Sequence, residues 1–142
     1  RVAIVQFIKC DGTVGELQAA ARLPGVRVEQ CGCGFLPKSD GASLAEHRAA
    51  AEAGLRRAME IVAEGEAALV ILDEACLAVQ RGLIEEQAVL ELLAASPPAM
   101  CLVLTGRGAS EAIVAAADTV TEMREIKHGF KAGIAAQQGV EW

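Results

Sequence analysis

Aromatic residues are scarce in this chain of 142 residues, which has no tyrosine, one tryptophan and three phenylalanines. The hydrophobic residues, 53% of the total, are therefore mainly aliphatic. A chain this apolar is not typical of intrinsic disorder, and its length suits one domain with one core. We expect residues 1–142 to form a single α/β domain.

An excess of basic residues is also missing. The chain has 13 Lys and Arg against 19 Asp and Glu, a net charge of −6, whereas a nucleic-acid surface needs clustered cations. No apolar run approaches the roughly 18 residues that cross a bilayer, and there is no signal-peptide pattern. We expect a cytoplasmic protein with neither a nucleic acid nor a membrane as partner.

Histidine occurs only twice, and the five cysteines form an odd set. The pair Cys31 and Cys33 has one intervening residue, which matches neither a redox motif nor the usual zinc spacing. We therefore expect reduced, mostly buried thiols and no metal cluster built on cysteine.

The run 68–72 is the central feature of the sequence. Its five apolar residues show no alternation, which suits a strand buried on both faces of a parallel sheet, and Asp73 and Glu74 follow directly. Ligands of open α/β sheets bind beyond the carboxyl ends of the strands. An apolar strand that ends in two acids is typical of a Walker B segment, which holds Mg²⁺ on a nucleotide; it is equally typical of a strand that ends in a solvated turn.

Strand and helix patterns alternate along the whole chain. Such alternation predicts mostly parallel strands joined by crossover helices. Ser43 and Ser110 are expected helix N-caps, and His47 is expected on the surface. The predicted strands are 2–8, 26–31, 68–72, 100–104 and 118–123, and the predicted helices are 16–23, 44–64, 83–95 and 111–117.

Several polar residues follow the predicted strands or lie in the last segment of the chain. Gln6 and Lys9 close the first strand, and Arg107 lies between two glycines where the guanidinium of an arginine can reach a phosphate. Lys127 and Gln137 lie in the segment 124–142. Each position suits an anion-binding residue or an ordinary exposed turn. Phe35, in a glycine-rich loop, either packs into the core or lines a pocket.

The ordered set of these segments resembles one family, the P-loop-type corrinoid (cobalamin) adenosyltransferases. Each motif is weak alone, but together they cover nearly the whole chain in the family's order. The similar segments are 1–9, which resembles the family's second strand, 69–74, which resembles its Walker B strand, and 104–109, 117–124, 127–128 and 132–142, which resemble its C-terminal signature.

The resemblance implies a three-layer α/β fold of the P-loop NTPase (RecA-like) type and transfer of the 5′-deoxyadenosyl group of ATP to the cobalt(I) of a corrinoid, cobalamin or cobyrinic acid a,c-diamide. Asp73 and Glu74 match the family's Mg²⁺-binding acids, and Arg107 matches an arginine with a phosphate or structural role. Phe35 matches an aromatic that packs on the corrin face and eases reduction of the cobalt. The family further implies a homodimer and a flavoprotein reductant.

The sequence departs from the family in two places. Family members carry a P-loop on the strand and helix before the segment that begins here, whereas residues 12–16 lack the lysine and the spacing of that motif. The chain also starts without Met, inside a strand pattern, so we expect a fragment or processed product that lacks the first strand and P-loop and binds ATP weakly alone. Residues 36–38 stand where the family has a second aromatic, a tryptophan, which predicts an altered corrin contact.

Two other interpretations are open. A non-catalytic relative would bind a corrinoid or a partner protein without nucleotide chemistry, which the altered loop at 36–38 favours. The second is a P-loop NTPase-like domain of unrelated function. A binding module has no need of two acids at a strand end, and the ordered C-terminal signature favours the adenosyltransferase.

Overall fold

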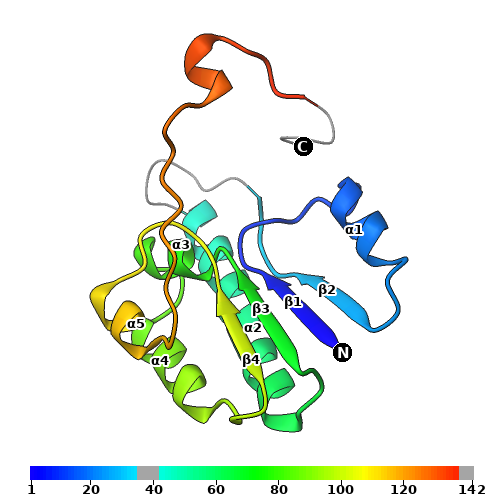
Figure 1. Cartoon of the computed structure of the whole chain (residues 1–142), viewed down its shortest axis with the longest axis vertical. Coiled ribbons are helices and arrows are strands. Elements are labelled where there is room, and N and C mark those ends of the chain that lie inside the picture. Colours follow the sequence, from blue (N-terminus) through cyan, green and yellow to red (C-terminus); the bar gives the residue numbers. More distant parts are fainter. Residues whose placement is uncertain (35–41, 138–142) are drawn as a thin grey trace.

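A computed structural model describes residues 1–34 and 42–137 of the protein (Figure 1). Helices and strands alternate along most of it. They are β1 (Val2–Gln6), α1 (Gly15–Ala20), β2 (Val26–Gln30), α2 (Ala42–Glu64), β3 (Leu69–Asp73), α3 (Ala75–Gln80), α4 (Glu86–Ala95), β4 (Cys101–Leu104), α5 (Glu111–Ala116) and the short 3₁₀ helix η1 (Gly129–Ala132).

The four strands form one sheet in the order β2-β1-β3-β4, and every neighbouring pair is parallel. Gln6 lies opposite both Gln30 and Asp73, so the carboxyl ends of the three strands meet. The next pair, Leu72 and Leu104, is also in register, which brings Thr105 beside Asp73. This confirms the predicted α/β fold with a parallel sheet, an arrangement consistent with the RecA-like type.

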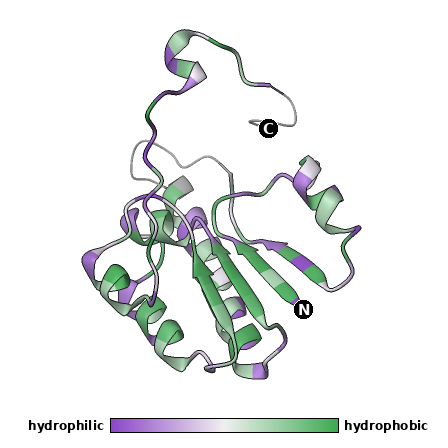
Figure 2. Ribbon diagram, in the orientation of Figure 1, coloured by the Kyte–Doolittle hydropathy of each residue, from purple (hydrophilic) through white to green (hydrophobic). Residues whose placement is uncertain are grey.

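One face of the sheet carries the core. Val5, Val70 and Leu72 are completely buried there, and α2 packs across β1 and β3. Figure 2 shows the central strand β3 and its neighbour β4 as almost continuously hydrophobic ribbon. Burying alternate strand residues against one long helix is the main stabilising term of such a fold.

Helix α2 lies very close to the sheet at Gly54. A Cβ atom at this position would come within 2.7 Å of the Cys31 Cβ atom, so only glycine fits the contact. On the same side of the helix Leu55 and Val62 are buried, and His47 is only 5% exposed. The prediction of a surface position for His47 is wrong because the residue lies one helical turn before buried Ala51.

The opposite face of the sheet is less covered. Here Ile4, Val28 and Ile71 are half-buried, and together with Ala20 of α1 they line part of a hollow of about 300 Å³. Parallel sheets are normally covered on both faces. Within the described residues, this face is therefore where the fold leaves room for a ligand or a further element.

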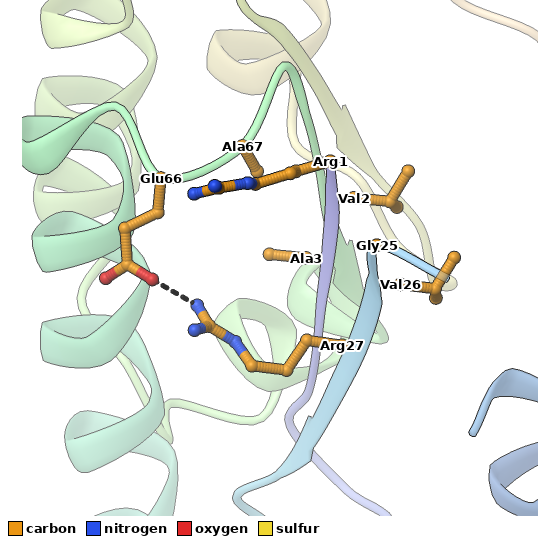
Figure 3. A pocket seen from close by; sticks show the side chains of 8 residues that line it. All are labelled: Arg1, Val2, Ala3, Gly25, Val26, Arg27, Glu66 and Ala67. Atoms are coloured by element: carbon orange, nitrogen blue, oxygen red, sulfur yellow. Dashed lines mark hydrogen bonds and ion pairs between the residues drawn. The ribbon is translucent and has the colours of Figure 1, made fainter. Parts of the chain in front are cut away.

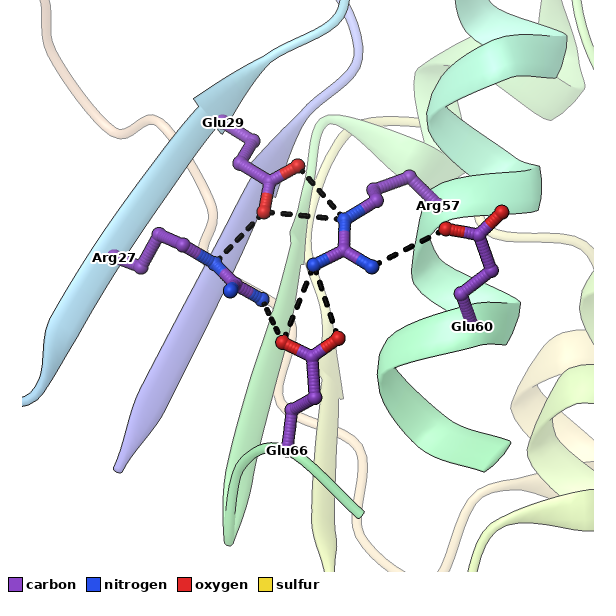
Figure 4. A network of polar contacts seen from close by, with 5 residues as sticks. All are labelled: Arg27, Glu29, Arg57, Glu60 and Glu66. Atoms are coloured by element: carbon purple, nitrogen blue, oxygen red, sulfur yellow. Dashed lines mark hydrogen bonds and ion pairs between the residues drawn. The ribbon is translucent and has the colours of Figure 1, made fainter. Parts of the chain in front are cut away.

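A charged network ties α2 to the edge strand β2 (Figure 4). Arg57 of α2 donates hydrogen bonds to Glu29, Glu60 and Glu66, and Arg27 donates to Glu66 and forms an ion pair with Glu29 at 2.7 Å. The hydrogen bond to Glu29 is the largest of the causes that raise the pKa of Arg57. All five residues are already partnered, which indicates a structural role.

The predicted strand 118–123 is wrong. Residues 117–128 contain no helix or strand, and Val120 and Met123 are 54% and 93% exposed. The segment pairs with neither edge strand, β2 or β4. Without a hydrogen-bonded neighbour, an extended segment does not form a β-strand. Figure 1 shows this part of the chain running beyond the carboxyl end of the sheet.

The thiols also differ from expectation in part. All five cysteines are free, as predicted, but only Cys76 is buried; Cys31 is half-buried, and Cys10, Cys33 and Cys101 are exposed. No helix in residues 1–34 and 42–137 combines the length and the apolar character that crossing a bilayer requires.

Candidate functional site

Three strands bring their polar ends together at the carboxyl edge of the sheet. Asp73, the last residue of β3, accepts a hydrogen bond from Gln6 Nε2 on its Oδ2 atom at 3.1 Å. Its Oδ1 atom accepts a hydrogen bond from the Thr105 hydroxyl, just after β4, at 2.9 Å. Gln30, the last residue of β2, donates to Gln6 Oε1 at 3.0 Å. The chain of contacts fixes the Asp73 carboxylate in position.

Lys9 and Glu16 complete this group from the β1–α1 connection and from α1. The Lys9 ammonium lies 2.8 Å from Glu16 Oε1 and 3.9 Å from Asp73 Oδ2. Partial burial works to lower the pKa of Lys9, but the hydrogen bond and charge of Glu16, with the charges of Asp73 and Glu74, together raise it. Lys9 is therefore a firmly charged cation beside the acids.

Glu74 occupies an unusual position at the turn between β3 and α3. It is the one non-glycine residue of the described ranges with positive φ, at 61°, a conformation that most side chains avoid. Its N–H donates to Thr105 Oγ1 at 3.0 Å, and the Cys76 N–H donates to the Thr105 carbonyl at 3.1 Å. Thr105 thus holds the corner that presents both acids.

Gly106 makes this corner possible. Its φ is +120°, and a Cβ atom there would lie 3.0 Å from the Leu77 nitrogen and 3.2 Å from the Glu74 Cα atom. The backbone after β4 therefore packs directly on the acidic turn. Arg107 follows in the same loop and is exposed.

The acidic pair suits a hard divalent cation. Glu74 Oε2 is buried and has no hydrogen-bond partner among the described residues, which is a costly state for a carboxylate oxygen unless a cation or a ligand completes it. Carboxylate oxygens are the protein ligands that Mg²⁺ prefers. No group of three or more His, Cys, Asp or Glu able to hold a metal is found in those residues, so such an ion would take further ligands from substrate or water.

The predicted site residues divide into three groups. Gln6, Lys9 and Asp73 are joined by direct contacts, and Glu74 is adjacent through the Thr105 corner. Lys127 and Gln137 lie in the segment after α5 and are exposed. Within the described residues, no contact joins Lys127 to Asp73 or to the residues bonded to it. Phe35 lies outside the described residues.

Sequence reasoning missed Glu16 and Thr105, the two residues that organise the group. A signal for Thr105 existed, because it follows the predicted strand 100–104 just as Asp73 follows 68–72, and parallel strands bring such positions together. Nothing in the local sequence distinguishes Glu16 from any exposed glutamate of a short helix.

A second hollow, of about 200 Å³, lies at the amino end of the sheet (Figure 3). Arg1, Arg27 and Glu66 line it beside the first residues of β1 and β2. It is at the opposite end of the strands from Asp73, and Arg27 is already committed to Glu66. In open α/β sheets ligands bind at the carboxyl ends, so the Asp73 group is the candidate site.

Known proteins resemble this chain over all or nearly all of its length. The profile of the family described as ATP:corrinoid adenosyltransferase BtuR/CobO/CobP matches residues 1–142. The corrinoid adenosyltransferase of Pseudomonas aeruginosa is 41% identical over 143 residues, covering 100% of this chain and 70% of that protein. That of Sinorhizobium sp. is 37% identical, covering 99% and 66%.

The corrinoid adenosyltransferase of Escherichia coli K12 is 31% identical over 142 residues, covering 100% of this chain and 71% of that protein. The chain thus spans from 66% to 71% of the length of these relatives. The match includes every segment that forms the Asp73 group. The chain belongs to the ATP:corrinoid adenosyltransferase family BtuR/CobO/CobP.

Proposed function

We propose that this protein transfers the 5′-deoxyadenosyl group of ATP to the cobalt of a reduced corrinoid, cobalamin or cobyrinic acid a,c-diamide. Family membership over residues 1–142 carries the proposal. In this reaction cobalt(I) supplies the electron pair for a new cobalt–carbon bond to the ribose C5′ atom. The C5′–oxygen bond breaks, and its electrons leave with inorganic triphosphate.

The chemistry demands that the protein neutralise the leaving triphosphate and hold two reactants in line. Lys9 and Gln6 offer a cation and an amide donor at the rim of the hollow above the sheet. Arg107 adds a guanidinium on the loop that packs against Glu74. Lys127 and Gln137, in the C-terminal segment, are further candidates to contact an anionic ligand.

Asp73 and Glu74 are the proposed Mg²⁺ ligands. The orphaned Glu74 oxygen and the neighbouring Asp73 carboxylate fit this role. Bound there, Mg²⁺ would supply positive charge for the triphosphate. Thr105 and Gln6 keep the Asp73 carboxylate oriented for it through their hydrogen bonds.

Phe35 is the proposed corrin contact. An aromatic ring on the lower face of the corrin would favour loss of the axial ligand and ease reduction of cobalt(II). Phe35→Ala should then slow transfer from cobalt(II) with a reductant more than transfer from pre-formed cobalt(I). Equal slowing of both would remove this role.

A cytoplasmic location, a flavoprotein reductant and a homodimer are further parts of the proposal. The exposed apolar residues after α5 support an assembly of chains, since Met123, Ile126 and Phe130 are more than 80% exposed, and such residues commonly mark contact surfaces.

The test is an anaerobic transfer assay with cob(I)alamin, MgATP and the Glu74→Gln variant. The variant keeps the size of the side chain and removes its charge, so transfer should fall by at least tenfold while the circular dichroism spectrum is unchanged. Glu52→Gln, on the exposed side of α2, alters the net charge equally and should keep wild-type activity. Full activity in Glu74→Gln would remove Glu74 from the site.

A further inference from the structure

Glu16 holds a position in the site that an anionic ligand would need. Its Oε1 atom accepts hydrogen bonds from Gln6 Nε2 at 3.0 Å and from Lys9 Nζ at 2.8 Å. One carboxylate oxygen therefore accepts from both of the donors that line this side of the hollow, while Gln6 Nε2 also donates to Asp73 Oδ2 at 3.1 Å. Gln6 and Lys9 converge on a single negatively charged oxygen, which is the arrangement that binds a phosphate oxygen.

The helix that carries Glu16 is weakly attached. Every residue of α1 is exposed or half-buried, and Val14 at its N-cap provides no side-chain hydrogen bond. Glycines at positions 12 and 15 precede the helix or begin it. A segment with so little buried surface opens at low free-energy cost, so the contacts of Glu16 are a main polar tie between α1 and the strand ends.

Glu16 is itself stabilised as a charged carboxylate by the two residues that donate to it. The hydrogen bond from Gln6, followed by that from Lys9, lowers the pKa of Glu16, so the carboxylate stays charged near neutral pH. A polyphosphate brought to the same two donors would face this charge at contact distance. Like charges so close repel strongly where they are partly shielded from water, and the two anions cannot share the site.

We propose that Glu16 is a positioning residue that occupies an oxyanion position until the polyphosphate of the nucleotide displaces it, whereupon α1 moves away from the strand ends. While Glu16 occupies this position, it keeps Lys9 and Gln6 aimed into the hollow. The inference rests on the proposed function in naming the nucleotide polyphosphate as the ligand.

The first test is calorimetric titration of the protein with inorganic triphosphate, without corrinoid. Glu16→Gln retains a group that can accept from Gln6 and removes the competing charge, so it should bind triphosphate about three- to tenfold more tightly than the wild type. The gain should shrink at high salt, where exposed charges are screened. Glu52→Gln, with the same change in net charge, should bind like the wild type.

Three results would overturn the inference. Equal or weaker binding by Glu16→Gln would mean that the carboxylate only supports the fold or assists the ligand. The same gain in Glu52→Gln would show a general charge effect. Absence of triphosphate binding in all three proteins would show that Lys9 and Gln6 form no anion site.

Hydrogen exchange provides the second readout. Triphosphate should speed the exchange of amides in residues 15–20 of the wild type, whereas in Glu16→Gln these amides should exchange fast without it. Slower exchange of the wild-type helix on binding would contradict displacement. Because neither measurement involves adenosyl transfer, failure of the transfer assay with these results intact would contradict the proposed function alone.

Discussion

Replacing Thr105 by valine tests how the acidic corner is held. Thr105 Oγ1 donates to Asp73 Oδ1 at 2.9 Å and accepts from the Glu74 N–H at 3.0 Å. Valine has nearly the same shape, so the change removes both hydrogen bonds without opening a cavity. It leaves an amide unpaired at a residue whose φ of 61° already costs free energy.

The magnitude follows from these two bonds. A hydrogen bond to a charged group contributes about 1.5–3 kcal/mol, and an unsatisfied partly buried N–H costs about 1 kcal/mol or more. Water restores part of this, because the Asp73 side chain is 26% exposed. We expect the free energy of unfolding to fall by about 2 kcal/mol, which for a domain of this size lowers the urea midpoint by roughly 1 M.

The assay is urea unfolding of wild type, Thr105→Val and Thr105→Ser, followed by circular dichroism. Serine retains the hydroxyl and should lose less than half of what valine loses. The transfer activity of Thr105→Val should also fall, because Asp73 and Glu74 lose their shared support. If valine and serine variants unfold at the same midpoint, the hydroxyl does not hold the corner and this account of Thr105 is wrong.

Three further predictions concern the same regions. Gly106→Ala should destabilise the protein by about 1–3 kcal/mol and reduce transfer, because Gly106 has positive φ and its new Cβ atom would meet the Glu74 backbone. Gly12→Ala, with open space around it, should do neither. Equal unfolding midpoints for the two variants would refute the close packing of Gly106 on the acidic turn. Cys76, which is 4% exposed and has its pKa raised by burial, should react with maleimide far more slowly than exposed Cys10; comparable rates by mass spectrometry would contradict the fold around α3. The carboxyl carbon of Glu16 should titrate in NMR below the usual range of glutamate. Because the pKa is lower in the folded state, the stabilisation from this group is present above the usual pKa and is lost as the pH falls through the lowered value. Gln6→Leu should raise the pKa of Glu16, and an unshifted pKa in the wild type would refute the double hydrogen bond.

The sequence predicted the sheet well where apolar runs were short and bounded. Each of the strands β1 to β4 overlaps a predicted one, because a buried parallel strand needs a run of aliphatic residues and a polar or glycine-rich end. Ser110 was predicted as an N-cap and does accept a hydrogen bond from the Ile113 N–H at 3.2 Å. These signals are local, and local rules suffice for them.

The errors arise where tertiary contacts decide. Residues 118–123 were predicted as a strand but pair with no neighbouring strand, and the local sequence cannot supply one. His47 is polar yet lies on the buried side of α2, and cysteines 10, 33 and 101 lie outside the core although thiols are commonly buried. The chemical type of a residue does not by itself determine whether it lies in the core or on the surface.

The candidate site was predicted in its acids but not in their support. Asp73 and Glu74 stood out because two acids end an apolar strand. Thr105, which holds both acids, and Glu16, which contacts Gln6 and Lys9, lie 32 and 57 residues away from Asp73 in the sequence. Only the parallel register and the placement of α1 bring them together. The roles of Lys127, Gln137 and Phe35 stay predictions.

The most direct test of the central claim is product analysis after anaerobic incubation with cob(I)alamin and MgATP. The account predicts a cobalt–carbon bonded adenosylcorrinoid together with an equal amount of inorganic triphosphate, and at least tenfold less of both products in Glu74→Gln. Release of phosphate or diphosphate without an adenosylated corrinoid would show nucleotide hydrolysis and contradict adenosyl transfer. Corrinoid binding with no reaction of ATP would favour a non-catalytic relative.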